Sequence, residues 1–218
     1  MQHSSLNYTD VARMIWACRD APAVPFIRIP DATEGDIQKA TDIGALGLIV
    51  PMVDDAEKME QAVHFAKYPP EGRRSQGGGQ YGRLWGSDYR QTWNENLMVI
   101  AMVETLIGVD ASAEIAGVDG VDGIFVASGD LGSFSGKRQG DPEYEALVDK
   151  INDGIESAGK YAGGPSAWMQ TREGYQFFPG PSTGSLIRMG TRVSLEEADP
   201  CRFLESGDTP VAGENPCP

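Results

Sequence analysis

Two acidic residues stand at the ends of apolar runs that have the composition of β-strands. Glu104 follows the run 97–103, and Asp130 follows the run 122–127 after one serine and one glycine. If these runs form neighbouring parallel strands, both carboxylates lie at the same end of the sheet. Two carboxylates that leave coordination positions free suit a hard divalent cation. The spacing also fits acids that cap the following helices or pair with an arginine, so both interpretations stay open at this point.

Two basic residues are further candidates for chemistry. Arg28 ends a short β-type run, and its planar guanidinium suits a carboxylate or a developing oxyanion. A salt bridge to a nearby acid would explain the same position. His3 precedes the first helical segment, and its ordinary pKa near neutrality suits a general base. A terminal histidine without a role gives the same pattern.

A glycine-rich stretch at 75–86 could approach an anion through its backbone, yet it matches neither the dinucleotide-binding pattern nor the P-loop. We interpret it as a mobile loop beside the active site. Tyr81, Arg83 and Trp85 then become candidates for contact with substrate. Ordinary packing is the alternative explanation for the aromatic residues.

Strand-like segments alternate with amphipathic helical segments along most of the chain, which predicts an α/β fold with right-handed crossovers. The nearly continuous apolar run 46–53 is typical of a strand buried on both faces in a parallel sheet. Thr33 with Asp36 indicates a helix start, and Gly44 indicates the end of that helix. We expect six strands, within 24–30, 46–53, 97–104, 122–128, 160–165 and 184–190.

Composition restricts both size and partners. A chain of 218 residues with 40% hydrophobic residues predicts one domain, over 1–204, and a disordered tail over 205–218. The net charge of -14 argues against nucleic acid as a partner. No apolar run approaches the roughly 20 residues needed to cross a bilayer, and the first residues lack a signal-peptide pattern, so we expect a cytoplasmic protein without membrane partners. Three cysteines without CxxC spacing predict reduced thiols.

Several stretches together resemble the HpcH/HpaI aldolase family, the metal-dependent class II pyruvate aldolases. The stretches are "MQHSS", "PFIRIP", "IGALGLIVPMVDDAEKMEQAVHFAKYPPEGRRS" and "MVETLIGVDASAEIAGVDGVDGIFVASGDLG". The resemblance extends from His3 to about residue 195. It implies a (β/α)₈ barrel of the TIM type in which Glu104 and Asp130 hold Mg²⁺, Mn²⁺ or Co²⁺. Glu104 matches the glutamate of the family's "ET" motif, and Asp130 matches the aspartate of its "GPADLS" motif, here "ASGDLG".

The resemblance also implies how substrate would bind. A 2-oxo acid such as pyruvate would chelate the metal, with its carboxylate at the backbone of Ser128, Gly129 and Asp130. Arg28 matches the arginine that stabilises the enolate and the aldehyde oxygen. His3 matches the histidine of the family's "EH" motif, which acts as the base.

The implied function is a divalent-metal-dependent aldolase that cleaves or forms 4-hydroxy-2-oxo acids, to or from pyruvate and an aldehyde, through a metal-stabilised enolate. Alternatives are oxaloacetate decarboxylation, enolate chemistry like that of the relative macrophomate synthase, or an inactive truncated remnant. The family also forms oligomers, so we expect a homo-oligomer when the protein is intact.

The sequence departs from the family pattern at several points. It begins two residues before His3, so the barrel is expected to lack its first two strands and first helix. Gln2 replaces the glutamate of the "EH" motif, and Met102 stands where many members have a glutamine.

Overall fold

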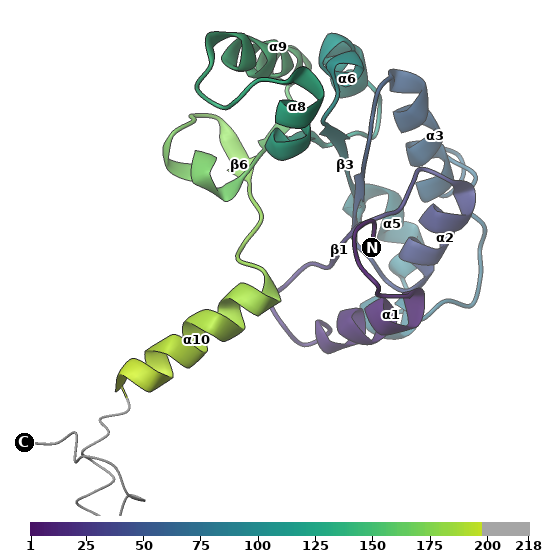
Figure 1. Cartoon of the computed structure of the whole chain (residues 1–218). Helices are drawn as coiled ribbons and strands as arrows, with labels where there is room; N and C mark the ends of the chain where they lie inside the picture. The colour runs from purple at the N-terminus through teal and green to yellow at the C-terminus, as the bar shows by residue number, and fades with distance from the viewer. Residues whose placement is uncertain (198–218) are drawn as a thin grey trace, which may run out of the picture. The chain divides into compact units, whose positions relative to one another are not determined.

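A computed structural model describes residues 1–197 of the chain (Figure 1). The chain divides into two compact units, Met1–Phe178 and a second that begins at Pro179. The first unit contains the whole sheet, and the described part of the second contains helix α10, Thr183–Glu197. The tail predicted for 205–218 lies outside the described residues, and the predicted domain boundary at 204 stays a prediction.

Six parallel strands form one sheet in which each strand pairs with the next along the chain. Sequential parallel order requires a crossover after every strand, and helical segments supply these crossovers. The α/β class predicted from the alternating pattern is therefore confirmed. The strands are β1 Phe26–Arg28, β2 Gly47–Val50, β3 Met98–Val103, β4 Gly123–Val126, β5 Tyr161–Gly163 and β6 Tyr175–Phe177.

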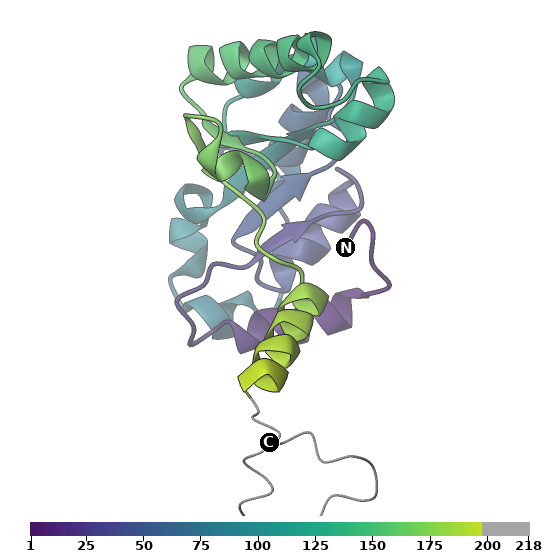
Figure 2. The same cartoon turned by 60° about the vertical axis from the view of Figure 1, so that its left-hand side comes forward.

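Helices cover the outer face of the sheet, as the ribbons of α2 (Glu34–Asp42), α3 (Ala56–Ala66), α6 (Leu106–Asp110) and α9 (Pro142–Ala158) show (Figure 1), and the turned view shows the strands with helices around them (Figure 2). The predicted cap at Thr33 is present, since its side chain accepts a hydrogen bond from the Asp36 N–H at 3.1 Å. Gly44 ends this helix with a φ of +101°. The remaining helices of the first unit are α1 Tyr8–Ala17, α4 Tyr81–Trp85, α5 Tyr89–Asn96, α7 Ser112–Ala116, α8 Ser128–Ser135 and the 3₁₀ helix η1 Ser166–Gln170.

The sheet is strongly curved. Side chains of its two edge strands, β1 and β6, contact each other. The rings of Phe26 on β1 and Phe177 on β6 lie 5.6 Å apart, and Phe177 also contacts Phe125 on β4. Glycine makes room for these rings, since a Cβ atom at Gly47 would lie 2.2 Å from the Phe26 ring. Alternate strand residues such as Ile27 point outward and are buried under the helices.

The sixth strand lies elsewhere than the sequence pattern predicted. Residues 184–190 belong to α10, and the sixth strand is β6 at 175–177. Leu186, Met189 and Val193 follow helical spacing and no proline interrupts them, so the segment satisfies a period of 3.6 residues better than a period of two. The aromatic run at 175–177 has high β-propensity and follows Gly174, whose φ is +81°.

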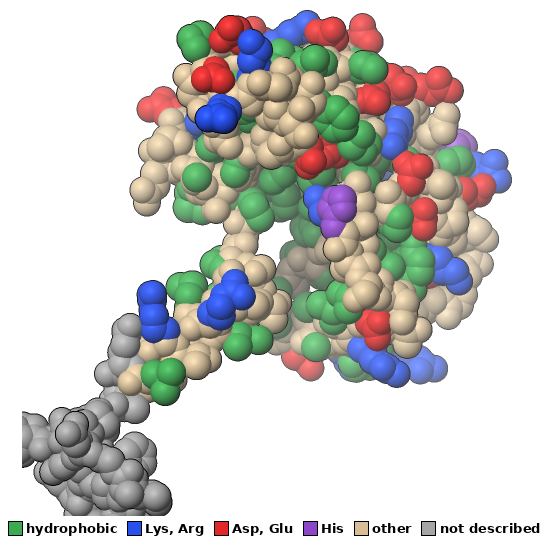
Figure 3. Space-filling model, in the orientation of Figure 1, with side chains coloured by type: hydrophobic (Ala, Val, Ile, Leu, Met, Phe, Trp, Pro, Cys, Tyr) green, Lys and Arg blue, Asp and Glu red, His purple; other side chains and the backbone are tan. Residues whose placement is uncertain are grey.

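No helix among residues 1–197 has both the length and the apolar character that crossing a bilayer requires. Acidic side chains are spread over the face shown in Figure 3, in keeping with the net charge of -14.

A close helix contact depends on glycine and gives a test of the fold. A Cβ atom at Gly154 of α9 would lie 2.8 Å from the Ala113 nitrogen of α7. We expect Gly154→Ala to lower the free energy of unfolding by about 1–3 kcal/mol, because the two helices must separate. Gly35→Ala in α2 is the matched control, since no described atom beyond its chain neighbours and its own helix backbone lies within 4 Å of its added Cβ. Urea unfolding measures both, and equal effects would contradict the packing argument.

Candidate active site at the carboxyl end of the sheet

Glu104 directly follows β3 and is almost completely buried, with 3% of its surface exposed. Alternation along the strand places Met102 and Glu104 on the interior face, while Val103 packs outward beneath the helices. The residue after it, Thr105, caps α6 by accepting a hydrogen bond from the Gly108 N–H at 3.0 Å. Glu104 itself therefore does not cap this helix, which removes one of the alternatives left open by the sequence.

A backbone N–H from the neighbouring connection holds the Glu104 side chain. The Met52 N–H donates to Glu104 Oε1 at 2.7 Å. Met52 follows β2 and adopts a φ of +51°, in the left-handed region that side chains other than glycine rarely occupy. The next N–H, of Val53, returns to the sheet and donates to the Met102 carbonyl at 3.2 Å. Met52, which follows β2, thus fixes the carboxylate of Glu104, which follows β3.

Asp130 lies in the first turn of α8, which begins just after β4. Ser128, Gly129 and Asp130 are the first three residues of this helix, and no side chain in the described part of the chain caps it. The N–H groups of a first turn have no partner within the helix, and the positive end of the helix dipole favours a nearby negative charge. The Ser128 carbonyl accepts a hydrogen bond from the Tyr144 hydroxyl at 3.1 Å, which fixes the start of α8 on α9. Asp130 is exposed.

The two predicted carboxylates come together. Burial raises the pKa of Glu104 above the ordinary glutamate value, and the negative charge of Asp130 raises it further. The Met52 N–H and the positive charge of Arg28 act in the opposite direction. Residues 1–197 contain no group of three or more histidine, cysteine, aspartate or glutamate side chains that could together hold a metal ion. Two adjacent carboxylates nonetheless suit Mg²⁺ or Mn²⁺, which take few protein oxygens and leave positions for water and substrate.

Arg28 is the last residue of β1 and lies at the same end of the sheet. Its Nη1 atom is 3.7 Å from the sulfur of Met102, a weak acceptor. Among residues 1–197 it forms no ion pair, so the salt-bridge alternative for Arg28 is not what the structure contains. A half-buried guanidinium with one weak partner keeps most of its donors available to an anion.

His3 lies in a turn at the carboxyl end of β1. The Met1 amino group donates to the Arg28 carbonyl at 2.8 Å, and the Ser4 N–H donates back to the Met1 carbonyl at 3.3 Å. The turn brings His3 to the end of the sheet that carries Arg28. Its side chain is exposed and makes no hydrogen bond or ion pair with a described residue. The base role assigned to it by resemblance stays a prediction.

The glycine-rich stretch does not lie beside these residues, and its interpretation as an active-site loop was wrong. Tyr81 is buried with its ring stacked on that of Tyr89, at a centroid distance of 4.4 Å. Trp85 donates to the Gly44 carbonyl at 3.0 Å, just before β2 begins. These contacts place the stretch at the amino end of the strands, opposite Glu104. Arg83 is exposed on the same short helix, and the aromatic residues serve packing.

Sequence reasoning missed the groups that support the two carboxylates. The Thr105 hydroxyl donates to the Asp54 side chain, which ties the start of α6 to the connection after β2. Lys58 donates to the Met52 carbonyl at 3.1 Å and pairs with Asp31 at 2.8 Å. Asp54 and Lys58 stand at a helix start, where such residues are ordinary, so their types gave no signal. The left-handed conformation of Met52 also has no signature in its residue type.

The fold and the site define a class: curved parallel β/α sheets that carry polar groups at the carboxyl ends of their strands, as in TIM barrels. Residues 4–177 match the model of one family within this class, the HpcH/HpaI aldolase/citrate lyase family. The chain belongs to that family. The resemblance seen in the sequence motifs is therefore confirmed.

Individual relatives agree with this assignment. The chain is 31% identical over 169 residues to a 2-keto-3-deoxy-L-rhamnonate aldolase of Salmonella gallinarum, covering 74% of this chain and 62% of the relative. It is 39% identical over 148 residues to a hydroxypyruvate/pyruvate aldolase of Chromohalobacter salexigens, covering 65% of this chain and 58% of the relative. The aligned part of the chain thus spans about three fifths of the length of these relatives.

Solved structures confirm the fold. A family protein from Burkholderia cenocepacia superposes with a TM-score of 0.80 at 30% identity, over 90% of this chain and 82% of that one. Macrophomate synthase superposes with a TM-score of 0.75 at 20% identity, over 93% of this chain and 76% of that one, which supports the fold alone. The predicted class, a TIM-type barrel with six strands present, is confirmed as an open six-stranded parallel sheet.

The buried charge of Glu104 predicts how stability depends on pH. Because the pKa of Glu104 is raised in the folded state, the folded protein binds more protons than the unfolded chain, and stability falls as pH rises above about 4.3. Glu104→Gln keeps an acceptor for the Met52 N–H and removes the charge. We expect this variant to have a higher Tm than the parent at pH 7 in EDTA and a weaker decline of Tm between pH 5 and 8. The exposed Glu60→Gln is the control, and a lower Tm for Glu104→Gln would contradict the argument.

Proposed function

We propose that this chain carries the active site of a divalent-metal-dependent aldolase that acts on 2-oxo acids. The reaction would cleave or form 4-hydroxy-2-oxo acids, to or from pyruvate and an aldehyde. The observation that carries the proposal is the convergence of three groups at one end of the sheet. Asp130 and Arg28 both shift the pKa of the buried Glu104, so all three charges act on one small volume.

Glu104 and Asp130 are the residues that would hold the metal, Mg²⁺, Mn²⁺ or Co²⁺. Their mutual repulsion and the burial of Glu104 make the pair costly without a cation, and a bound cation offsets both costs. Such an ion supplies Lewis acidity that polarises the keto group of a 2-oxo acid. The names of the relatives, an aldolase for a keto-deoxy sugar acid and one for hydroxypyruvate and pyruvate, support this reaction class.

The chain's own residues divide the remaining work. The free N–H groups of the first turn of α8, at Ser128, Gly129 and Asp130, would bind the substrate carboxylate. Arg28 would donate to the oxygen that gains negative charge when the carbon–carbon bond breaks. His3 would accept the proton of the hydroxyl group that becomes the aldehyde.

Oxaloacetate decarboxylation, or enolate chemistry like that of macrophomate synthase, is the second candidate. Met102 favours this second candidate. Its thioether is a poorer hydrogen-bond acceptor than the amide oxygen of the glutamine that many family members have at this position. The Arg28 guanidinium is therefore free to bind a further carboxylate. The substrate would then carry two carboxylates. A homo-oligomer and a cytoplasmic location stay predictions.

Removal of metal tests the proposed reaction. We expect pyruvate release from 4-hydroxy-2-oxo acids to fall at least about 100-fold in EDTA and to return with Mn²⁺ or Mg²⁺, because the polarising charge is lost. Oxaloacetate assayed in parallel separates the two candidates by product. Full activity in EDTA would exclude the metal role. A chain without activity that still binds Mn²⁺ would support an inactive remnant.

Arg28 is the residue whose replacement best tests the charge argument. We expect Arg28→Lys to lower kcat by about 10²–10³-fold while Mn²⁺ affinity changes little, because a lysine cannot reproduce the planar donor pair. Steady-state kinetics and Mn²⁺ titration measure the two effects. Arg73→Lys, at an exposed ion pair with Glu34, is the control. Unchanged kcat for Arg28→Lys would remove Arg28 from the mechanism.

A further inference from the structure

Lys58 occupies an unusual position between two connections at the carboxyl end of the sheet. It belongs to the first turn of α3, and its ammonium group donates to the Met52 carbonyl at 3.1 Å and pairs with Asp31 at 2.8 Å. Asp31 follows β1 three residues after Arg28. Lys58 thus joins the connection after β1 to the connection after β2.

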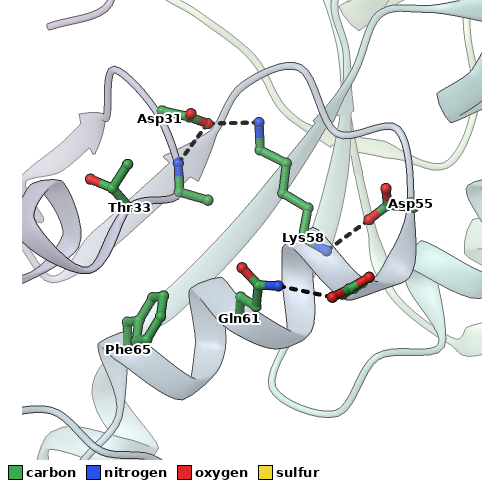
Figure 4. A pocket seen from close by; sticks show the side chains of 8 residues that line it. Asp31, Thr33, Asp55, Lys58, Gln61 and Phe65 are labelled. Carbon is green, nitrogen blue, oxygen red and sulfur yellow. Dashed lines mark hydrogen bonds and ion pairs between the residues drawn. The ribbon is translucent and has the colours of Figure 1, made fainter.

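Contacts of its backbone and of its ammonium group together fix the conformation of Lys58. The Lys58 backbone N–H donates to the cap residue Asp55 at 2.8 Å, and the side chain extends from there toward Asp31 (Figure 4). Its stem lines a cavity of about 440 Å³ together with Gln61 and Phe65. With 24% of its side chain exposed, Lys58 is partly shielded from water, whereas its partner Asp31 is 59% exposed, so the ion pair itself is open to solvent.

Met52 transmits this contact to the buried carboxylate. In its left-handed conformation, with φ of +51°, the carbonyl of Met52 meets Lys58 while its N–H donates to Glu104 Oε1 at 2.7 Å. Both polar groups of one backbone residue are therefore engaged, one by a cation and one by an anion. Rotation of Met52 to an ordinary conformation would break both contacts together.

We propose that Lys58, anchored by Asp31, is a positioning residue that holds Met52 in its left-handed conformation and thereby fixes the Glu104 carboxylate for its ligand. The proposal rests on the proposed function for the identity of that ligand, a divalent cation. It assigns the cause of the Met52 conformation to Lys58 and not to local sequence. Lys58 touches neither substrate nor metal and acts only through the backbone of Met52.

Amide hydrogen exchange tests the proposal independently of activity. In the metal-free chain, Lys58→Met should speed exchange of the Met52 N–H about 10-fold or more, while amides inside β3 such as Ala101 keep their rates. Asp31→Asn should give a smaller effect in the same direction, and it serves as the second variant if Lys58→Met does not fold. Lys67→Met is the matched control, because it removes a lysine pair with Glu71 beyond the other end of α3. Unchanged Met52 exchange, or an equal change in Lys67→Met, would overturn the proposal.

Mn²⁺ binding supplies the second readout. Residues that orient a metal ligand typically contribute about 10–100-fold to affinity, so Lys58→Met should weaken Mn²⁺ binding about 10-fold. In a Met52→Asn background the loss should shrink, because asparagine tolerates the left-handed region without help. An undiminished loss would show that Lys58 acts by another route and overturn the proposal. If the parent chain binds no Mn²⁺, the proposed function fails, and Met52 exchange alone still decides the role of Lys58.

Discussion

The buried charge of Glu104 is the constraint on which the carboxyl end of the sheet depends. A carboxylate with 3% of its surface exposed must be compensated, and a side-chain partner buried with it would add a further desolvation cost. The chain uses a backbone N–H, that of Met52, which carries no net charge of its own. A left-handed methionine costs about 1–2 kcal/mol, and a good hydrogen bond to a charged group contributes about 1.5–3 kcal/mol. The hydrogen bond therefore offsets the cost of the left-handed Met52 conformation because its acceptor, Glu104, is charged and buried.

The sequential order of the parallel strands explains how a few residues can form the candidate site. When each strand pairs with the next, the connection after one strand lies beside the end of its neighbour. Met52, after β2, therefore reaches Glu104, after β3, and Ala127 donates from the end of β4 to the Val103 carbonyl at 3.1 Å. Positions that are far apart in the chain become neighbours by register alone. The site needs no long insertion to gather its groups.

The same register explains what the sequence could predict. The placement of Glu104, Asp130 and Arg28 at one end of the sheet could be predicted because strand ends are visible as the limits of apolar runs, and parallel strands share one end. The role of Met52 was invisible, since its function lies in a backbone angle and not in its side chain. The sixth strand was misplaced because a seven-residue apolar segment fits both periods, and only the continuation through Val193 distinguishes helix from strand. The stretch at 75–86 was misjudged because glycine content reports freedom of the backbone and not which end of the sheet it faces.

Two arginines show how the fold separates stability from chemistry. Arg74 lies at the amino end of the sheet with its side chain fully buried, donates to the Tyr89 hydroxyl at 2.9 Å and pairs with Asp42 at 3.1 Å. Its guanidinium also lies 4.3 Å from the Trp93 ring centroid. The charge of Arg74 therefore stabilises the packing at this end of the sheet. Among the described residues, Arg28 at the opposite end has one side-chain hydrogen-bond partner, the Met102 sulfur. Both Nη atoms of Arg74 therefore have oxygen partners, whereas the Arg28 side chain, beside the buried Glu104, has only a weak sulfur partner within residues 1–197.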